Sequence, residues 1–325
     1  MRAAVCRAYG TPDVVTVEEL PPPDVSAGQV RVQVSAAAVN FPDVLLVADK
    51  YQMSVPPPFV PGSEFAGVVE GVGDGITTLA NGDRVFGSAL VGAFAEEIVV
   101  SPESLTRTPD GIDDAAAAAF GVAHRTAFHV LRSVARVQPG EELVVLGAGG
   151  GVGLAAVQLG ALLGASVTAV ASSAEKLDVA KTEGATTLLN HRAGDLRQAL
   201  REAHPDGVDV VVDPVGGDLA EPALRSLRWA GRFVTVGYAS GTIPRIPLNL
   251  VMLKGIEVVG FQMLSFAQNA ADEFRTNEAD LIELLAAGRV LPHIGKRFPF
   301  DDVAAALEYV GNGRAIGKVV LDVSR

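Results

Sequence analysis

A glycine-rich turn between an apolar strand and an apolar helix constrains this fold more than any other feature of the sequence. The run Leu143–Leu146 is followed by Gly-Ala-Gly-Gly-Gly-Val-Gly at positions 147 to 153 and then by a helical pattern from Leu154. This order is typical of a dinucleotide-binding fingerprint in its Ala-x-Gly-x-x-Gly form. The alternative is a tight turn without a ligand. The predicted cofactor contacts in the turn are Ala148, Gly150, Gly151, Val152 and Gly153.

The roles of two of these glycines follow from what a side chain would obstruct. Gly150 would let the backbone approach a pyrophosphate, and Gly153 would let the helix pack closely on the strand. The amino terminus of the helix would then face the negative charge of the phosphates.

Two patterns along the 325 residues predict an α/β chain of two domains. The first hundred or so residues contain short strands such as Val30–Val34 and Gly67–Val72, separated by proline and glycine turns. From Leu143 onward, apolar runs alternate with helical stretches, which predicts a doubly wound parallel sheet. An amphipathic helix over residues 274–287 and a tail strand, Lys318–Val323, follow, and the tail is expected to return to the first module. Asp113 and Asp114 are expected to cap the helix that starts at Ala115.

Charge and cysteine content exclude several classes of function. The net charge of −12 disfavours nucleic acid and anionic membranes as partners. The single cysteine, Cys6, allows no internal disulfide and favours a reducing, cytoplasmic location, although its burial and reactivity do not follow from the sequence. We find no signal-peptide pattern at the amino terminus. The uncharged stretch 143–174 is interrupted by glycines, so we expect no membrane span there.

The end of the second strand of the parallel sheet indicates which nucleotide is bound. An acidic residue there would hold the ribose 2′-hydroxyl of NAD. The sequence instead has Ser172, Ser173 and Lys176, two hydroxyls and a cation that suit a 2′-phosphate. We therefore expect NADPH as the cofactor. The alternative is that the serines cap a helix and that Lys176 is a solvated surface charge.

Several motifs in the same order resemble the zinc-independent quinone oxidoreductases of the medium-chain dehydrogenase/reductase superfamily, over nearly the whole chain. The matching segments are Val39–Asp43, Pro61–Gly67, Gly82–Val85, Gly92–Glu96, the glycine turn with Gln158, and Gly231–Val234. The resemblance implies a GroES-like substrate domain over residues 1–122 and 264–325, and a Rossmann domain over residues 123–263. It also implies NADPH as hydride donor, quinones or activated enones as acceptors, and a homodimer.

The resemblance also places site residues. It implies that Asn40, Asp43 and Tyr51 line a pocket between the domains, where Asn40 and Tyr51 could donate hydrogen bonds to the oxyanion formed by hydride addition. Asp43 is expected to orient a side chain or a water molecule. Each of the three also has an ordinary structural alternative, as turn residue, helix cap and packing group respectively. Weaker implications concern further cofactor contacts: Thr126, His191, Gly237, Tyr238, Phe261 and Lys318.

No metal is expected. Where zinc-dependent relatives hold the ion with a cysteine and a histidine, this chain has Asn40 and Ser63, which are not normal zinc ligands. The sequence departs from the family pattern at Leu45, where a tyrosine is common, and at His191, which replaces a tyrosine near the 2′-phosphate. Whether His191 takes over the role of that tyrosine stays open.

Three functions remain in view. The first is a metal-free NADPH-dependent reductase of quinones or α,β-unsaturated carbonyls. The second is an enoyl-thioester reductase acting on an acyl-CoA, which performs the same conjugate hydride addition. The third is a non-catalytic, crystallin-like NADPH-binding protein, because a shared fold does not guarantee a shared activity. The sequence names neither the physiological acceptor nor the number of electrons transferred in each step.

Overall fold

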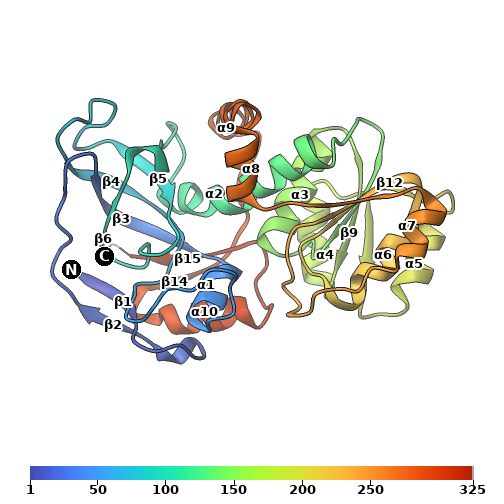
Figure 1. The fold of residues 1–325 in the computed structure, drawn as a ribbon, viewed down its shortest axis with the longest axis horizontal. Coiled ribbons are helices and arrows are strands. Elements are labelled where there is room, and N and C mark those ends of the chain that lie inside the picture. Colours follow the sequence, from blue (N-terminus) through green and yellow to red (C-terminus); the bar gives the residue numbers. More distant parts are fainter. Residues whose placement is uncertain (324–325) are drawn as a thin grey trace. The chain divides into compact units, whose positions relative to one another are not determined.

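The computed structural model describes residues 1–323 and divides the chain into two compact units. The first unit consists of Met1–Val122 together with the carboxyl-terminal segment from Leu291, and the second consists of Ala123–Val290. Figure 1 shows the labelled elements of both units.

The second unit is built around a six-stranded parallel sheet with the strand order β10-β9-β8-β11-β12-β13. This is the doubly wound order, in which the chain starts at a central strand and reverses direction between the first and fourth strands. The central strands β8, β9 and β11 are buried and mainly apolar, as expected where helices cover both faces of a sheet. The strands are β8 (Glu142–Leu146), β9 (Ser166–Ala171), β10 (Thr187–Asn190), β11 (Val208–Asp213), β12 (Leu227–Thr235) and β13 (Glu257–Gly260).

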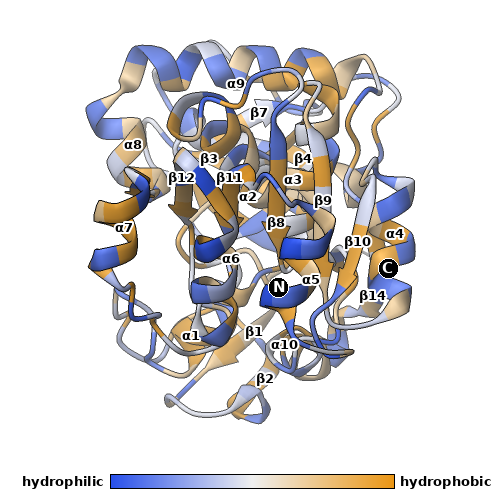
Figure 2. Cartoon of the chain, turned by 90° about the vertical axis from the view of Figure 1, so that its right-hand side faces the viewer, coloured by the Kyte–Doolittle hydropathy of each residue, from blue (hydrophilic) through white to orange (hydrophobic). Residues whose placement is uncertain are grey.

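Helices alternate with these strands, as the sequence pattern predicted. Figure 2 shows apolar residues concentrated on the strands and on the helix α3 that follows the glycine turn. The helices of this unit are α3 (Gly151–Leu162), α4 (Ala174–Thr182), α5 (Leu196–Ala203), α6 (Ala220–Ser226), α7 (Leu248–Lys254), α8 (Met263–Asn269) and α9 (Ala271–Ala286). Helix α2 (Asp114–His129) begins in the first unit, where Asp113 Oδ1 accepts a hydrogen bond from the backbone N–H of Ala116 at 2.7 Å. The expected aspartate cap is confirmed.

The first unit contains a seven-stranded, mainly antiparallel sheet and a separate two-stranded sheet. The strand order is β14-β15-β3-β4-β5-β7, with β6 paired to β3. The predicted return of the tail is confirmed, because β15 pairs antiparallel with β3. The elements are β1 (Arg2–Cys6), β2 (Val15–Glu19), β3 (Val30–Val39), α1 (Phe41–Val47), β4 (Glu64–Val72), β5 (Arg84–Ser88), β6 (Glu97–Val100), β7 (Leu105–Arg107), β14 (Ile294–Pro299), α10 (Val303–Gly311) and β15 (Lys318–Asp322).

The second unit extends further along the chain than expected. Residues 264–290 were assigned to the substrate domain, but the structure groups them with the parallel sheet. The reason is a buried cluster around His129, whose ring stacks on Phe274 with centroids 4.8 Å apart and contacts Phe266 at 5.1 Å. His129 Nδ1 accepts a hydrogen bond from Asn277 Nδ2 at 3.1 Å, which ties α9 to α2.

The structure also shows the environment of the single cysteine. Cys6 is fully buried, and burial raises the pKa of its thiol. Cys6 is therefore a packing residue that carries little thiolate at neutral pH.

Among residues 1–323 no helix combines the length and apolar character needed to cross a bilayer.

Candidate cofactor and catalytic sites

The glycine turn follows β8 and opens α3, as the fingerprint predicts. Gly147 has a φ of +62°, which favours glycine, and Gly150 occupies the N-cap position of α3. A Cβ on Gly153 would lie 2.1 Å from the carbonyl oxygen of Gly147, so no side chain fits between the helix and the turn. A Cβ on Gly150 would have 3.6 Å to its nearest neighbour, which leaves open space over the helix amino terminus. This backbone can accept a pyrophosphate closely.

Positively charged side chains gather beside this turn, where β9 and β10 end. Ser172, Ser173 and Lys176 follow β9, and His191 and Arg192 follow β10. The backbone N–H of His191 donates to Ala171 O at 3.1 Å, which holds the two strand ends together. The stem of Lys176 covers Gly149, because a Cβ on that glycine would lie 2.6 Å from the side chain of the lysine.

The electrostatics of this cluster favour an anion. Burial and then the charge of Arg192 lower the pKa of Lys176. Burial, Arg192 and Lys176, in that order, lower the pKa of His191. Cations that lower each other's pKa are stabilised when a negative charge binds among them. Ser173 also caps α4, since its Oγ accepts from the backbone N–H of Lys176 at 3.4 Å, and its hydroxyl hydrogen stays available as a donor.

Most of the other predicted cofactor residues of this unit lie at the same edge of the sheet. Gly237 and Tyr238 follow β12, and Phe261 follows β13, where its backbone N–H donates to Thr235 O at 3.0 Å. The carboxyl ends of parallel strands meet at one edge, which is where such sheets bind ligands. The ring of Phe261 also stacks on His129 with centroids 6.3 Å apart. Thr126 lies within α2.

Lys318 lies in the first unit, within a buried polar cluster. Its Nζ donates to Asn40 Oδ1 at 2.6 Å and to Glu64 Oε2 at 2.7 Å, and the side chains of Lys318 and Glu64 are 4% and 1% exposed. Asn40 Nδ2 donates to Glu64 Oε2 at 2.8 Å and to Ser63 Oγ at 3.3 Å. The ammonium and the carboxylate therefore fix which way the amide of Asn40 points.

Asp43 lies beside this cluster and is fully buried. Its Oδ2 accepts the backbone N–H of Asn40 at 2.7 Å, so the carboxyl group also completes a capping box with Asn40, the N-cap residue of α1. Burial raises the pKa of Asp43 to about 7, against the opposing effects of the Asn40 N–H, the Ser63 hydroxyl and Lys318. Burial and then the charge of Asp43 raise the pKa of Tyr51, which indicates that these two groups interact.

The donor set at this place does not fit a catalytic zinc ion. Asn40 and Ser63 offer an amide and a hydroxyl where thiolate and imidazole are the usual ligands. Asn40 Oδ1 already accepts from an ammonium group, which would repel a metal ion. Within the part of the chain that the structure describes, no three histidine, cysteine or acidic side chains are grouped to hold a metal.

Sequence reasoning missed three residues at these sites. Glu64 pairs with Lys318. Its position as an acid at the start of an apolar strand is the sequence signal that could have identified it. Arg192 adds a cation beside Lys176 and His191. Asp213 ends β11, and its Oδ1 accepts the backbone N–H groups of Val215 and Gly216, both at 2.8 Å. An acid at the end of a buried apolar strand is a signal that a sequence can show.

Comparisons with known proteins agree with both units. Residues 26–110 match the Alcohol dehydrogenase GroES-like domain family, and residues 151–283 match the Zinc-binding dehydrogenase family. Quinone oxidoreductase-like protein 2 of Bos taurus is 36% identical over 99% of this chain and 92% of its own length. The Quinone oxidoreductase of Homo sapiens is 30% identical over 99% of this chain and 97% of its own. The solved structure of Escherichia coli quinone oxidoreductase complexed with NADPH superposes with a TM-score of 0.91 at 27% identity, covering 99% and 100% of the two chains.

Proposed function

Because the chain belongs to the quinone oxidoreductase family of medium-chain dehydrogenases/reductases, we propose that it is an NADPH-dependent, metal-free reductase of quinones or α,β-unsaturated carbonyls. One observation carries the choice of cofactor. The strand end that would present a carboxylate to NAD has none, and Lys176, His191 and Arg192 gather there beside the glycine turn. The Escherichia coli relative solved with NADPH supports the same choice.

In this proposal the second unit holds the cofactor through its backbone and its cations. The amino terminus of α3 binds the pyrophosphate, which Gly150 admits. Lys176 and Arg192 pair with the 2′-phosphate, and the hydroxyls of Ser172 and Ser173 donate to its oxygens. His191 contributes a further donor, as the family tyrosine would. When bound, NADPH supplies the hydride.

The first unit would stabilise the charge that hydride addition leaves on the acceptor oxygen. Tyr51 is the better placed of the proposed donors, because its phenol is protonated at neutral pH and its oxygen accepts from Gln52 Nε2 at 3.5 Å, which leaves its own hydrogen to donate. The amide hydrogens of Asn40 are directed at Glu64 and Ser63, so Asn40 would donate to an acceptor only by sharing one of them. Asp43, with a pKa of about 7, orients Tyr51 or a water and can hold the proton that the product oxygen takes up.

The test follows absorbance of the reduced cofactor with a naphthoquinone, phenanthrenequinone, an alkyl enone and crotonyl-CoA, each with NADPH and with NADH. We expect turnover of a quinone or enone that prefers NADPH and persists with a chelator. Lys176→Ala should raise the KM for NADPH about tenfold to a hundredfold with little change in kcat, because the lysine makes ground-state contacts with the phosphate. Lys181→Ala, on the exposed side of the same helix, is the matched control.

The outcomes separate the alternatives. Equal use of NADH and NADPH, unaffected by Lys176→Ala, would refute the assignment of NADPH. Efficient reduction of crotonyl-CoA alone would assign the enoyl-thioester reaction. Tight NADPH binding without turnover of any acceptor in the panel would favour the non-catalytic function.

A further inference from the structure

A basic pocket lies at the amino-terminal edge of the parallel sheet, opposite the glycine turn. Gly207, immediately before β11, and Leu227, the first residue of β12, both line it. Strand β11 has six residues, so the pocket is about 20 Å along the sheet from the carboxyl-terminal edge. Its volume is about 450 Å³, within the usual range for small-molecule sites.

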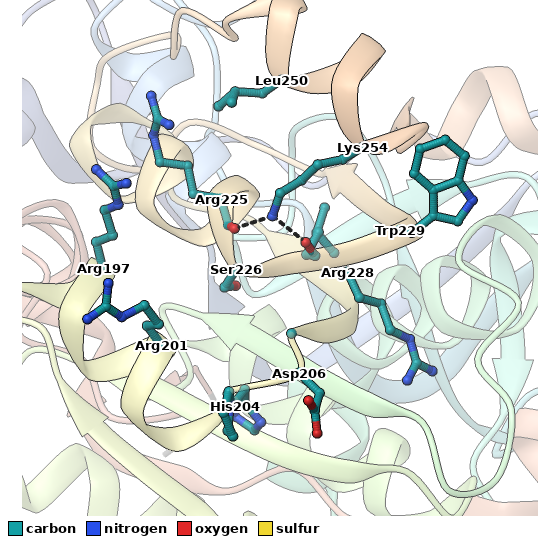
Figure 3. Close-up of a pocket in the computed structure, with 13 residues that line it drawn as sticks. Arg197, Arg201, His204, Asp206, Arg225, Ser226, Arg228, Trp229, Leu250 and Lys254 are labelled. Atoms are coloured by element: carbon teal, nitrogen blue, oxygen red, sulfur yellow. Dashed lines mark hydrogen bonds between the residues drawn. The ribbon is translucent and has the colours of Figure 1, made fainter.

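Local structure explains why cations collect there. Val208 pairs with Leu227 but Val210 pairs with Arg232, so residues 228–231 of β12 form a large bulge opposite the single residue Asp209. The bulge projects Arg228 and Trp229, and Trp229 is 72% exposed. Arg197 and Arg201 lie one turn apart on α5, on the same side of the pocket as Arg225 of α6 (Figure 3).

The charges around the pocket do not balance. It is lined by five of the 26 lysines and arginines of a chain whose net charge is −12. Arg225 pairs with Glu221, Arg228 pairs with Asp209, and Asp206 adds one carboxylate to the lining. Three carboxylates against five cations leave two positive charges. Lys254 Nζ donates only to backbone carbonyls, those of Arg225 at 2.5 Å and Leu227 at 2.6 Å (Figure 3).

The excess is centred on α5. Among the described residues, neither Arg197 nor Arg201 forms an ion pair, and the neighbouring Glu202 accepts from Gln198 Nε2 at 2.8 Å. Like charges four residues apart destabilise an isolated helix, and a bound anion would remove this penalty. Two guanidinium groups in reach of one another suit a phosphate dianion, which accepts paired hydrogen bonds.

We propose that this pocket binds the phosphate group of a small molecule at a site separate from the cofactor, with Arg197 and Arg201 as its principal ligands. Trp229 at the rim offers a face on which an attached ring can stack. The site does not deliver an acyl-CoA to the hydride, because it lies at the opposite edge of the sheet from the glycine turn. It is therefore a regulatory or accessory site and does not depend on the proposed reaction.

The test uses Trp229 as its reporter, since it is the only tryptophan of the chain. Its fluorescence is followed while phosphate, pyrophosphate, adenosine 5′-monophosphate or succinate is added at constant ionic strength. Saturating NADP⁺ is present so that the cofactor's own phosphate site is filled. We expect saturable changes with the three phosphate compounds, and an affinity about tenfold to a hundredfold lower in Arg197→Gln/Arg201→Gln. The control, Arg275→Gln/Arg289→Gln, removes two exposed charges elsewhere in the same unit.

Each outcome decides the proposal. Tighter binding of the nucleotide than of phosphate assigns a phosphorylated ring compound, and equal binding assigns the phosphate group alone. Succinate binding as tightly as pyrophosphate would overturn the phosphate assignment. An equal loss in both double variants would show a general charge effect and would overturn the site. If the NADPH proposal is wrong, NADP⁺ leaves the cofactor site unfilled and phosphate can bind there. Phosphate binding at the cofactor site would be unaffected by Arg197→Gln/Arg201→Gln. The double variant therefore distinguishes failure of the NADPH proposal from failure of the basic pocket.

Discussion

Asp43 is a single buried carboxyl group whose ionisation should govern part of the stability of the fold. Its pKa rises from 3.8 to about 7 in the folded chain, so the folded state keeps a proton that the unfolded state has lost. The resulting stability is fully present below pH 4 and disappears as the pH rises through 7. A shift of this size corresponds to a free energy on the order of 4 kcal/mol.

Asp43→Asn cannot ionise and should therefore escape this loss. Relative to the wild type, its free energy of unfolding should increase by roughly 2 to 3 kcal/mol between pH 5 and pH 8. Urea denaturation at several pH values measures the difference. Asp24→Asn, at an exposed position of the same unit, is the control. A difference between Asp43→Asn and the wild type that stays constant with pH would contradict the prediction.

His191 should make cofactor affinity depend on pH. Burial and two neighbouring cations hold its pKa below 6.5 in the free protein, and a bound phosphate would raise it. As the pH falls from about 8 to about 5.5, protonation of His191 should strengthen NADPH binding to the wild type, by at most about tenfold per pH unit. His191→Gln lacks this group, so its NADPH affinity should depend less on pH. Protonation of the 2′-phosphate itself affects the wild type and the variant equally. NADH lacks the 2′-phosphate, so its pH dependence of binding should be the same for both proteins. Parallel titration curves of the two proteins with NADPH would refute this role of His191.

The glycine turn between β8 and α3 contains one glycine needed for helix packing and one needed for cofactor binding. Substitutions at the two positions can therefore separate the effects on stability and on affinity. Gly153→Ala places a methyl group 2.1 Å from Gly147 O, so we expect a loss of about 1 to 3 kcal/mol or more in the free energy of unfolding. Gly150→Ala has space for its methyl group and a φ of −90°, so stability should change little. Its methyl group would instead stand where the pyrophosphate approaches, and NADPH affinity should fall at least about tenfold. Calorimetry and cofactor titration of both variants measure the two effects, and equal destabilisation by both would contradict the assignment.

Elements of this kind could be predicted because their signals are local. The parallel strands, the glycine turn and the aspartate cap of α2 each depend on residues within one element and its borders. The end of the second unit was misplaced because His129 and Phe274 contact each other across 145 positions of the chain. No period or spacing in the sequence reports such a contact.

The same limit applied at both sites. The pairing of the Lys318 ammonium with Glu64, 254 positions away, did not follow from the sequence. The basic pocket joins α5 to a bulge in β12, and a bulge has no signature as regular as an alternating strand. Side-chain orientation also escaped prediction, since only the structure shows that both amide hydrogens of Asn40 already have acceptors.

For the whole molecule, we propose the homodimer that the family resemblance implies, and the outer edge of the parallel sheet supports it. Strand β13 is the last strand of the sheet, and an open edge is a liability that pairing with a second copy removes. The helix α7, which contacts the neighbouring strand β12, is mainly apolar in Figure 2 although it lies at the surface, with Leu248 76% and Met252 74% exposed. Exposed apolar side chains in such a group are typical of an interface.

Leu248→Lys/Met252→Lys should therefore dissociate the dimer. In a two-fold symmetric interface each substitution counts twice, so four apolar side chains would be lost at about 1.5 to 3 kcal/mol each, and the dimer dissociation constant should rise by a factor of at least about a thousand. Sedimentation at micromolar concentration should show twice 33.6 kDa for the wild type and 33.6 kDa for the variant. Leu90→Lys, an equally apolar but separate surface position in the first unit, should leave the dimer intact. A wild-type chain that sediments as a monomer would show that α7 and β13 face solvent for another reason.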